Sequence, residues 1–192
     1  GFDSDGERDS EVEDVWENCS YNNFIIGSDG KIYANKSYNY ENYSTETYIH
    51  KDFITSWSMD GSLQFETDLG ELRTDEEYAY INTMTVAEDG TISMILSGDS
   101  IYKMTVDAQG NASGKVPLSE DAGKIFNNMD RVINKGDGTF VVLYYDENDW
   151  TKEFMVSYDP ATDALGEAIQ LPSNFNYGGY NILGISDDSE LL

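Results

Sequence analysis

The chain has 192 residues, with 37 Asp or Glu against 11 Lys or Arg, and its formal net charge at neutral pH is −26. Hydrophobic residues make up 39% and aromatic residues 13%, which is too much apolar material for a disordered chain. The acidity argues against nucleic acid as a partner, and no apolar run approaches the ~20 residues that membrane insertion requires.

Residues 1–17 are predicted to be an acidic N-terminal linker, because Asp and Glu fill most of positions 3–14. Val12, Val15 and Trp16 are the apolar residues from which an early strand would form. The sequence begins at Gly1 rather than Met, and its last residues, Leu191 and Leu192, fall inside an expected strand. We therefore expect the chain to be a piece of a larger protein.

Beyond residue 17, short alternating runs are separated by turns that contain glycine. Tyr102, Met104 and Val106, for example, alternate with polar neighbours, as the residues of a half-buried strand do. Asp-Gly between such runs is a strong hairpin signal, and we expect both central residues to take positive φ. Residues 120–130 are the only segment that offers a plausible helical turn. The turn dipeptides are Asp29-Gly30, Asp60-Gly61, Asp89-Gly90, Gln109-Gly110 and Asp137-Gly138.

The turns also repeat at a longer period. The first-turn glycines Gly30, Gly90 and Gly138 are 60 and 48 residues apart, and a four-stranded repeat of this length is typical of β-propeller blades. We therefore predict an all-β domain over residues 18–192, a partial β-propeller of four-stranded antiparallel blades. A β-sandwich is the alternative. The expected units are residues 22–72, 80–118, 129–171 and a truncated fourth unit at 180–192.

Three segments carry a resemblance to a known group of proteins. They are SWSMDGSLQFETDL (56–69), YAYINTMTVAEDGTISMI (78–95) and YDENDWTKEFMVSYDPATDALGEAIQLP (145–172). Together they resemble the N-terminal propeller-like region of extracellular solute-binding lipoproteins of gut-type Gram-positive bacteria. The resemblance implies a cell-surface location, a lipid anchor upstream of residue 1 and a solute-binding domain downstream of residue 192. We therefore predict a non-catalytic accessory domain of a surface lipoprotein, without a cofactor, linked to capture or sensing of a carbohydrate or peptide solute.

The expected topology separates two sides of the molecule. In an antiparallel blade, the first and third turns lie at one end, and the second turn and the inter-blade connection lie at the other. The tight glycine turns are expected at the first end, and the long loops rich in aromatic residues at the second. Binding residues are often found on loops, so a ligand would bind at the second end. The predicted ligand-binding face, for a carbohydrate or protein ligand, consists of Tyr38, Tyr40, Tyr43, Tyr145, Trp150 and Tyr177. The alternative is that these aromatic side chains pack between blades.

No motif assembles a catalytic or metal site. Cys19 and His50 are the only residues of their types, and a nucleophilic pair would need them in contact. Asp3-Ser4-Asp5-Gly6 and Asp146-Glu147-Asn148-Asp149 suggest calcium, yet neither completes a calcium loop. The chain is therefore predicted to be no enzyme, to hold no metal, and to have no catalytic residues.

Two further hypotheses remain open at this point. A β-propeller hydrolase acting on extracellular glycans would need paired carboxylates, whose separation the sequence does not show. An incomplete propeller also leaves open strand edges, which recruit partners. We therefore expect the edge at 182–192 to pair with another copy of the chain or to be covered by the N-terminal segment.

Overall fold

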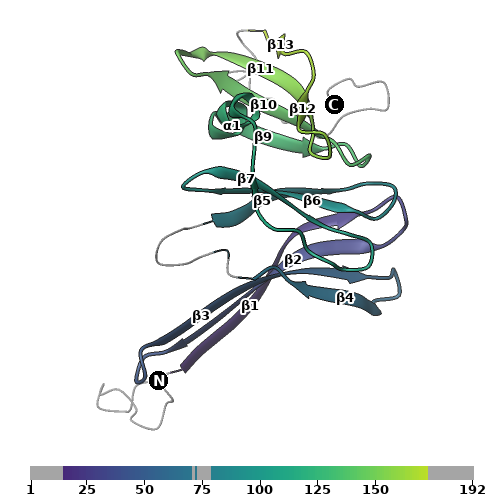
Figure 1. Ribbon diagram of the computed structural model, residues 1–192, viewed down its shortest axis with the longest axis vertical. Helices are drawn as coiled ribbons and strands as arrows, with labels where there is room; N and C mark the ends of the chain where they lie inside the picture. Colours follow the sequence, from purple (N-terminus) through teal and green to yellow (C-terminus); the bar gives the residue numbers. More distant parts are fainter. Residues whose placement is uncertain (1–14, 71, 73–78, 173–192) are drawn as a thin grey trace.

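Figure 1 shows the computed structural model, in which the structure describes residues 15–70, 72 and 79–172. The first sheet is an antiparallel meander of four strands with the order β1-β2-β3-β4. These strands are β1 (Val15–Ile26), β2 (Ile32–Asn42), β3 (Thr47–Trp57) and β4 (Leu63–Asp68). β1 begins at Val15, so residues 15–17 belong to the first strand rather than to a linker.

The second sheet repeats the same meander with shorter strands. Its order is β5-β6-β7-β8, formed by β5 (Ala79–Val86), β6 (Ile92–Gly98), β7 (Ile101–Val106) and β8 (Val116–Pro117). Helix α1 (Glu120–Asn127) then leads into the third sheet. No helix in the described part of the chain is long and apolar enough to cross a membrane.

The third sheet has the order β12-β11-β10-β9, and β13 also pairs with β11. Its strands are β9 (Met129–Asn134), β10 (Phe140–Asp146), β11 (Asp149–Asp159), β12 (Ala164–Leu165) and β13 (Ile169–Gln170). Three consecutive antiparallel meanders of four strands, the third with β13 added, confirm the prediction of propeller-like blades, whereas a β-sandwich would consist of two sheets, each packed on one face only. The expected unit at 180–192 and its strand edge lie outside the described residues.

Apolar side chains pack between successive blades. Tyr33 and Ile54 of the first blade meet Met84, Val86 and Met94 of the second in one cluster. Ile95 of β6, on the opposite face of that strand from Met94, belongs instead to a second cluster with blade three and α1. β6 is thus buried on both faces, and the second blade is the middle layer of the described domain (Figure 1).

The hairpin turns differ from the sequence-based expectation. In the first turn, the Gly27 amide donates to the Lys31 carbonyl at 2.9 Å, and the Gly30 amide donates to the Gly27 carbonyl at 2.9 Å. Gly30 takes φ of +76°, but Asp29 is not among the described residues with positive φ. The prediction that both residues take positive φ is therefore wrong. The turn is a three-residue loop whose last residue alone is left-handed, a conformation that favours glycine.

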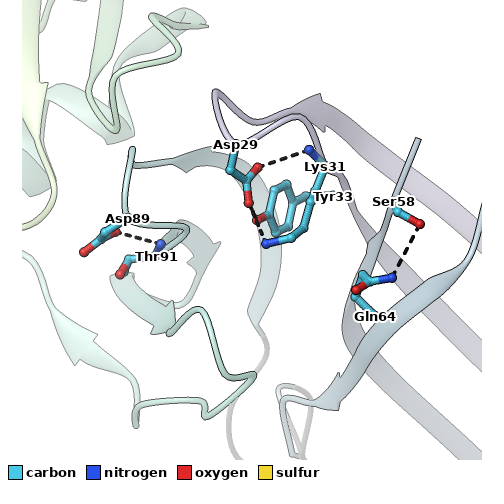
Figure 2. A network of polar contacts seen from close by, with 7 residues as sticks. All are labelled: Asp29, Lys31, Tyr33, Ser58, Gln64, Asp89 and Thr91. Carbon is cyan, nitrogen blue, oxygen red and sulfur yellow. Dashed lines mark hydrogen bonds and ion pairs between the residues drawn. The ribbon is translucent and has the colours of Figure 1, made fainter. Parts of the chain in front are cut away.

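The turn aspartates stabilise this conformation by accepting an amide hydrogen bond across the loop. Asp29 Oδ1 accepts from the Lys31 amide at 3.1 Å, and Asp89 Oδ1 accepts from the Thr91 amide at 2.9 Å (Figure 2). Asp29 also accepts from the buried Tyr33 hydroxyl at 2.8 Å, which links the first turn to the inter-blade cluster. In the β3–β4 turn, hydrogen bonds from Ser58 and Ser62 lower the pKa of Asp60 to about 2.

The two sheet interfaces also carry polar contacts. The Thr67 hydroxyl of blade one donates to the Gly110 carbonyl of blade two at 2.6 Å. The Thr85 hydroxyl of blade two donates to Asn134 Oδ1 of blade three at 2.8 Å. These bonds fix the relative positions of the blades at the end that carries the glycine turns.

Two glycine turns provide a matched test of inter-blade contact. Gly61 (φ +86°) has open space around its missing Cβ, whereas a Cβ on Gly138 (φ +89°) would lie 2.9 Å from Ala87 Cβ. Gly61→Ala should lower the free energy of unfolding by about 1–2 kcal/mol, the cost of a left-handed L-residue. Gly138→Ala should cost more, because it also forces blades two and three apart. Urea unfolding curves measure both, and equal losses would contradict the packing of Gly138 against Ala87.

Candidate functional site

Each innermost strand of the three sheets is interrupted by a β-bulge. Asn82 is the extra residue in β5, between the Ile81–Leu96 and Thr83–Ile95 pairs. Asp130 is the extra residue in β9, and the register of β1 shifts between Asn22 and Ile25. Asn22, the last paired residue before the shift in β1, lies five positions before Gly27, the first residue of the following turn. The unpaired Asn82 and Asp130 lie five positions before Ala87 and Lys135 in the same way. Bulges of this kind redirect a side chain and are frequent beside binding sites.

The bulges of β1 and β5 border a cleft of about 420 Å³ between the first and second blades, which we call the amide cleft. Four of its lining residues are asparagines. The cleft is lined by Asn22, Asn23, Asn35, Ser37, Asp52, Tyr80, Ile81 and Asn82. Its size falls within the range of small-molecule sites, which is roughly 300–1,000 Å³.

The asparagine amides retain free hydrogen-bonding groups. The Asn23 amide nitrogen donates to Asn35 Oδ1 at 3.2 Å, and the Asn82 amide nitrogen donates to Ser97 Oγ at 3.2 Å. Among the described residues, no hydrogen bond engages the Asn35 amide nitrogen, the amide oxygens of Asn23 and Asn82, or the Asn22 side chain. The cleft therefore presents both donors and acceptors to a bound molecule.

A buried carboxylate forms the floor of the cleft. Asp52 is 3% exposed, and its Oδ1 accepts from the Ser37 hydroxyl at 2.6 Å. Its Oδ2 lies 2.8 Å from His50 Nε2, and His50 Nδ1 lies 2.5 Å from Asn39 Oδ1. The β2–β3 register pairs Ser37 with Asp52 and Asn39 with His50, so these four side chains share one face of the sheet.

The charge of the cleft is set by Asp52 alone. Among the described residues that line it there is no Lys, Arg or Glu, and both Asp52 oxygens are already engaged by Ser37 and His50. An anionic ligand would find no positive partner there, and the chain around it carries a net charge of −26. The site is therefore suited to a neutral, hydrogen-bonding ligand.

The predicted aromatic residues of the first blade lie away from this cleft. Tyr38 and Tyr40 belong to strand β2 rather than to a loop. They alternate with Ser37 and Asn39, so they occupy the opposite face of the sheet from the buried Asp52 network. Tyr43 lies in the β2–β3 turn and packs edge-to-face on Tyr48, with ring centroids 6.4 Å apart.

The other predicted aromatic residues belong to the third blade. Tyr145 lies on β10, where its hydroxyl donates to Asp130 Oδ1 at 3.4 Å, and Trp150 lies on β11 with 82% of its surface exposed. The β2–β3 hairpin projects away from the third blade (Figure 1), so the structure does not bring these residues into one patch. Tyr177 lies outside the described residues. Their role in ligand binding stays a prediction.

The sheet register also separates the lone cysteine from the lone histidine. Cys19 pairs with Tyr38, whereas His50 pairs with Asn39, so the two side chains lie on opposite faces of the sheet. In the part of the chain that the structure describes, no group of three or more His, Cys, Asp or Glu residues is placed to hold a metal ion. Asp146 and Asp149 instead accept amide hydrogen bonds from Asn148 and Thr151.

Sequence reasoning missed the amide cleft, although a signal for it is present. Asn22 and Asn82 stand at the same distance, five residues, before the first residue of the turn that follows each strand. A polar residue that recurs at one place in successive repeats is the signal that could have indicated a shared bulge.

A second buried carboxylate was also not anticipated. Glu153 of β11 is 5% exposed, and neither of its carboxylate oxygens has a hydrogen-bond partner. Burial raises the pKa of Glu153, and the nearby charge of Asp130 raises it further, while Arg131 opposes both effects. The ionised form of Glu153 is thus unfavourable in the folded protein.

The coupling between His50 and Asp52 can be measured by a double-mutant cycle. His50→Ala and Asp52→Ala should each destabilise the fold, because each leaves a partner in a largely buried network without its hydrogen bond. The free energy of unfolding lost by the double variant should be smaller than the sum of the two single losses, by about 1 kcal/mol or more. Additive losses in urea unfolding would show that the pair is not coupled.

Glu153 predicts a pH-dependent stability. The pKa of Glu153 is higher in the folded than in the unfolded protein. Below the unfolded pKa the side chain is protonated in both states and does not lower the free energy of unfolding. As pH rises through the folded pKa, the buried carboxylate ionises and the protein is progressively destabilised. Glu153→Gln should therefore raise the midpoint of urea unfolding at pH 7.5 and leave it nearly unchanged at pH 4. Glu147→Gln, at an exposed position, is the control. If both variants change the urea midpoint equally at pH 7.5, Glu153 is not the source of the pH dependence.

No protein-family model matches the sequence, and no curated protein matches it either. Among solved structures, it is similar to the β-propeller domain of the Trilobed protease from Pyrococcus furiosus, with 8% identity and a TM-score of 0.43 over 80% of this chain and 43% of that one. Pyrococcus horikoshii acylaminoacyl peptidase gives 8% identity and a TM-score of 0.43, over 85% of this chain and 26% of that one. A protein of unknown function from Bacteroides caccae gives 11% identity and a TM-score of 0.35, over 71% of this chain and 54% of that one. The chain thus spans less than half the length of the first two.

Proposed function

We propose that this chain is a non-catalytic binding module, and that the amide cleft is its ligand site for a neutral carbohydrate. The observation that carries the proposal is the set of asparagine side chains with unused hydrogen-bonding groups around one cleft. A sugar hydroxyl both donates and accepts, so it pairs with either end of an amide. Lysine and arginine, which recognise acidic ligands, are absent from the described lining of the cleft.

Tyr80 supplies the apolar surface that such a site needs. It lines the cleft at the start of β5, and the residue is 41% exposed. A tyrosine ring offers a flat apolar face with a polar tip, which suits the apolar face of a sugar ring. Asp52 holds Ser37 in place from the buried side, so the polar wall of the cleft is fixed before a ligand arrives.

The hydrolase alternative has weaker support from this cleft. Glycosidases use two carboxyl groups, roughly 5–9.5 Å apart, on either side of the scissile bond. Asp52 is the single carboxylate among the described residues that line the cleft, and both of its oxygens are engaged by Ser37 and His50. The described lining of the cleft thus offers hydrogen-bonding groups for binding a sugar but not the pair of carboxyl groups that hydrolysis would use.

The proposal extends to the setting of the module. The resemblance of residues 56–69, 78–95 and 145–172 to solute-binding lipoproteins supports an accessory domain at the outer cell surface. There, a carbohydrate held in the amide cleft would be kept close to an uptake system. The high negative charge is compatible with this role, because it neither attracts nor repels a neutral ligand.

Glycan-array screening followed by calorimetry tests the proposal. Asn22→Ala and Asn82→Ala should each weaken binding of the best neutral glycan about five- to tenfold, because each removes hydrogen bonds worth about 1 kcal/mol or more. Asn148→Ala, in the exposed β10–β11 turn, is the matched control and should bind normally. Circular dichroism confirms that the variants are folded.

The same assay separates the cleft from the predicted aromatic residues. A Tyr43→Ala, Trp150→Ala double variant should bind as well as the parent chain. If that variant loses binding while the Asn22 and Asn82 variants keep it, the ligand site lies on the aromatic loops and the amide cleft is not the site.

A further inference from the structure

A second cleft lies next to the amide cleft, between the second and third blades. It has a volume of about 260 Å³ and combines an amide, a hydroxyl and an apolar floor. Its lining residues are Tyr80, Asn82, Ser97, Gly98, Ile101, Phe126, Asn127 and Met129. We call it the distal cleft.

The two clefts share a wall. Tyr80 and Asn82 line both of them, because β5 is the innermost strand of the middle blade and contacts both β1 and β9. Figure 1 shows the second sheet between the first and the third, which places the clefts on either side of it. The bulge residue Asn82 lies at this shared wall and lines both clefts, with its amide nitrogen hydrogen-bonded to Ser97 Oγ at 3.2 Å.

The distal cleft offers the same chemistry as the amide cleft. Asn127, exposed at the end of α1, contributes an amide, and the Ser97 hydroxyl is held by Asn82 at 3.2 Å. Phe126 and Ile101, which are buried in the inter-blade core, form its floor, and the half-buried Met129 lies beside them. Among its described lining residues there is no Lys, Arg, Asp or Glu, so it too is suited to a neutral polar ligand.

We propose that the two clefts form one groove for a linear neutral oligosaccharide, with one sugar unit in each cleft and Tyr80 and Asn82 at the linkage between them. This inference rests on the proposed function, because it specifies the ligand of the same site. The inner strand of each blade carries a polar side chain at its bulge, at the same position along the strand. Successive bulges can therefore contact successive sugar units of one chain. A single sugar would leave the distal cleft unused.

Calorimetry with neutral oligosaccharides of increasing length tests the groove. The probes are the monosaccharide, disaccharide and tetrasaccharide of the cellulose, starch and mannan series. In the series that binds, the tetrasaccharide should bind at least tenfold tighter than the monosaccharide. If the monosaccharide and the tetrasaccharide bind with equal affinity, and Asn22→Ala still weakens both, the amide cleft remains a binding site. The extended groove is then wrong.

Two matched variants locate the contribution of each cleft. Asn127→Ala, in the distal cleft, should weaken tetrasaccharide binding severalfold and leave monosaccharide binding unchanged. Asn22→Ala, in the amide cleft, should weaken both. If Asn127→Ala leaves tetrasaccharide affinity intact, the distal cleft holds no sugar and the inference is wrong. If no glycan of any length binds, the proposed function fails together with it.

Discussion

The structure depends on burying both faces of its middle blade. Strand β6 has apolar residues on each face, and Met94 and Ile95, one residue apart, belong to different inter-blade clusters. An apolar sheet face exposed to water is unfavourable, and stacking between the first and third blades removes both apolar faces of the middle blade from water. Both clefts lie beside β5, the strand that contacts β1 on one side and β9 on the other, and its bulge residue Asn82 lines each of them.

Much of the fold was predictable from local chemistry. Glycine turns between alternating runs predicted antiparallel blades of about four strands, and the structure shows three such sheets in succession. The conformation of the turns was not predicted correctly, because Asp-Gly also fits a loop of three residues, and the number of paired residues decides between the two forms. Helix α1 was only a plausible turn in the sequence, since its stability comes from packing Ala122 and Phe126 between the second and third blades rather than from its eight residues alone.

The candidate site was much harder to predict than the fold. Tyrosines in a long segment suggested a loop-borne face, but Tyr38 and Tyr40 are strand residues and the β2–β3 hairpin projects away from the other blades. The amide cleft joins residues of β1, β2, β3 and β5, and it requires the register of one sheet and the docking of a second. Neither is encoded in a short window of sequence. Glu153 was missed for the same reason, because its burial arises from tertiary packing around a charged residue that would ordinarily face solvent.

The inner-strand bulges have a consequence for how such a domain changes over time. A residue at a bulge is outside the regular ladder, so its side chain can be exchanged without altering the strand pairs on either side. Asparagine occupies this place in the first two blades and aspartate in the third. Under the function proposed above, one residue per blade could be varied to change the binding preference while the apolar packing stays as it is.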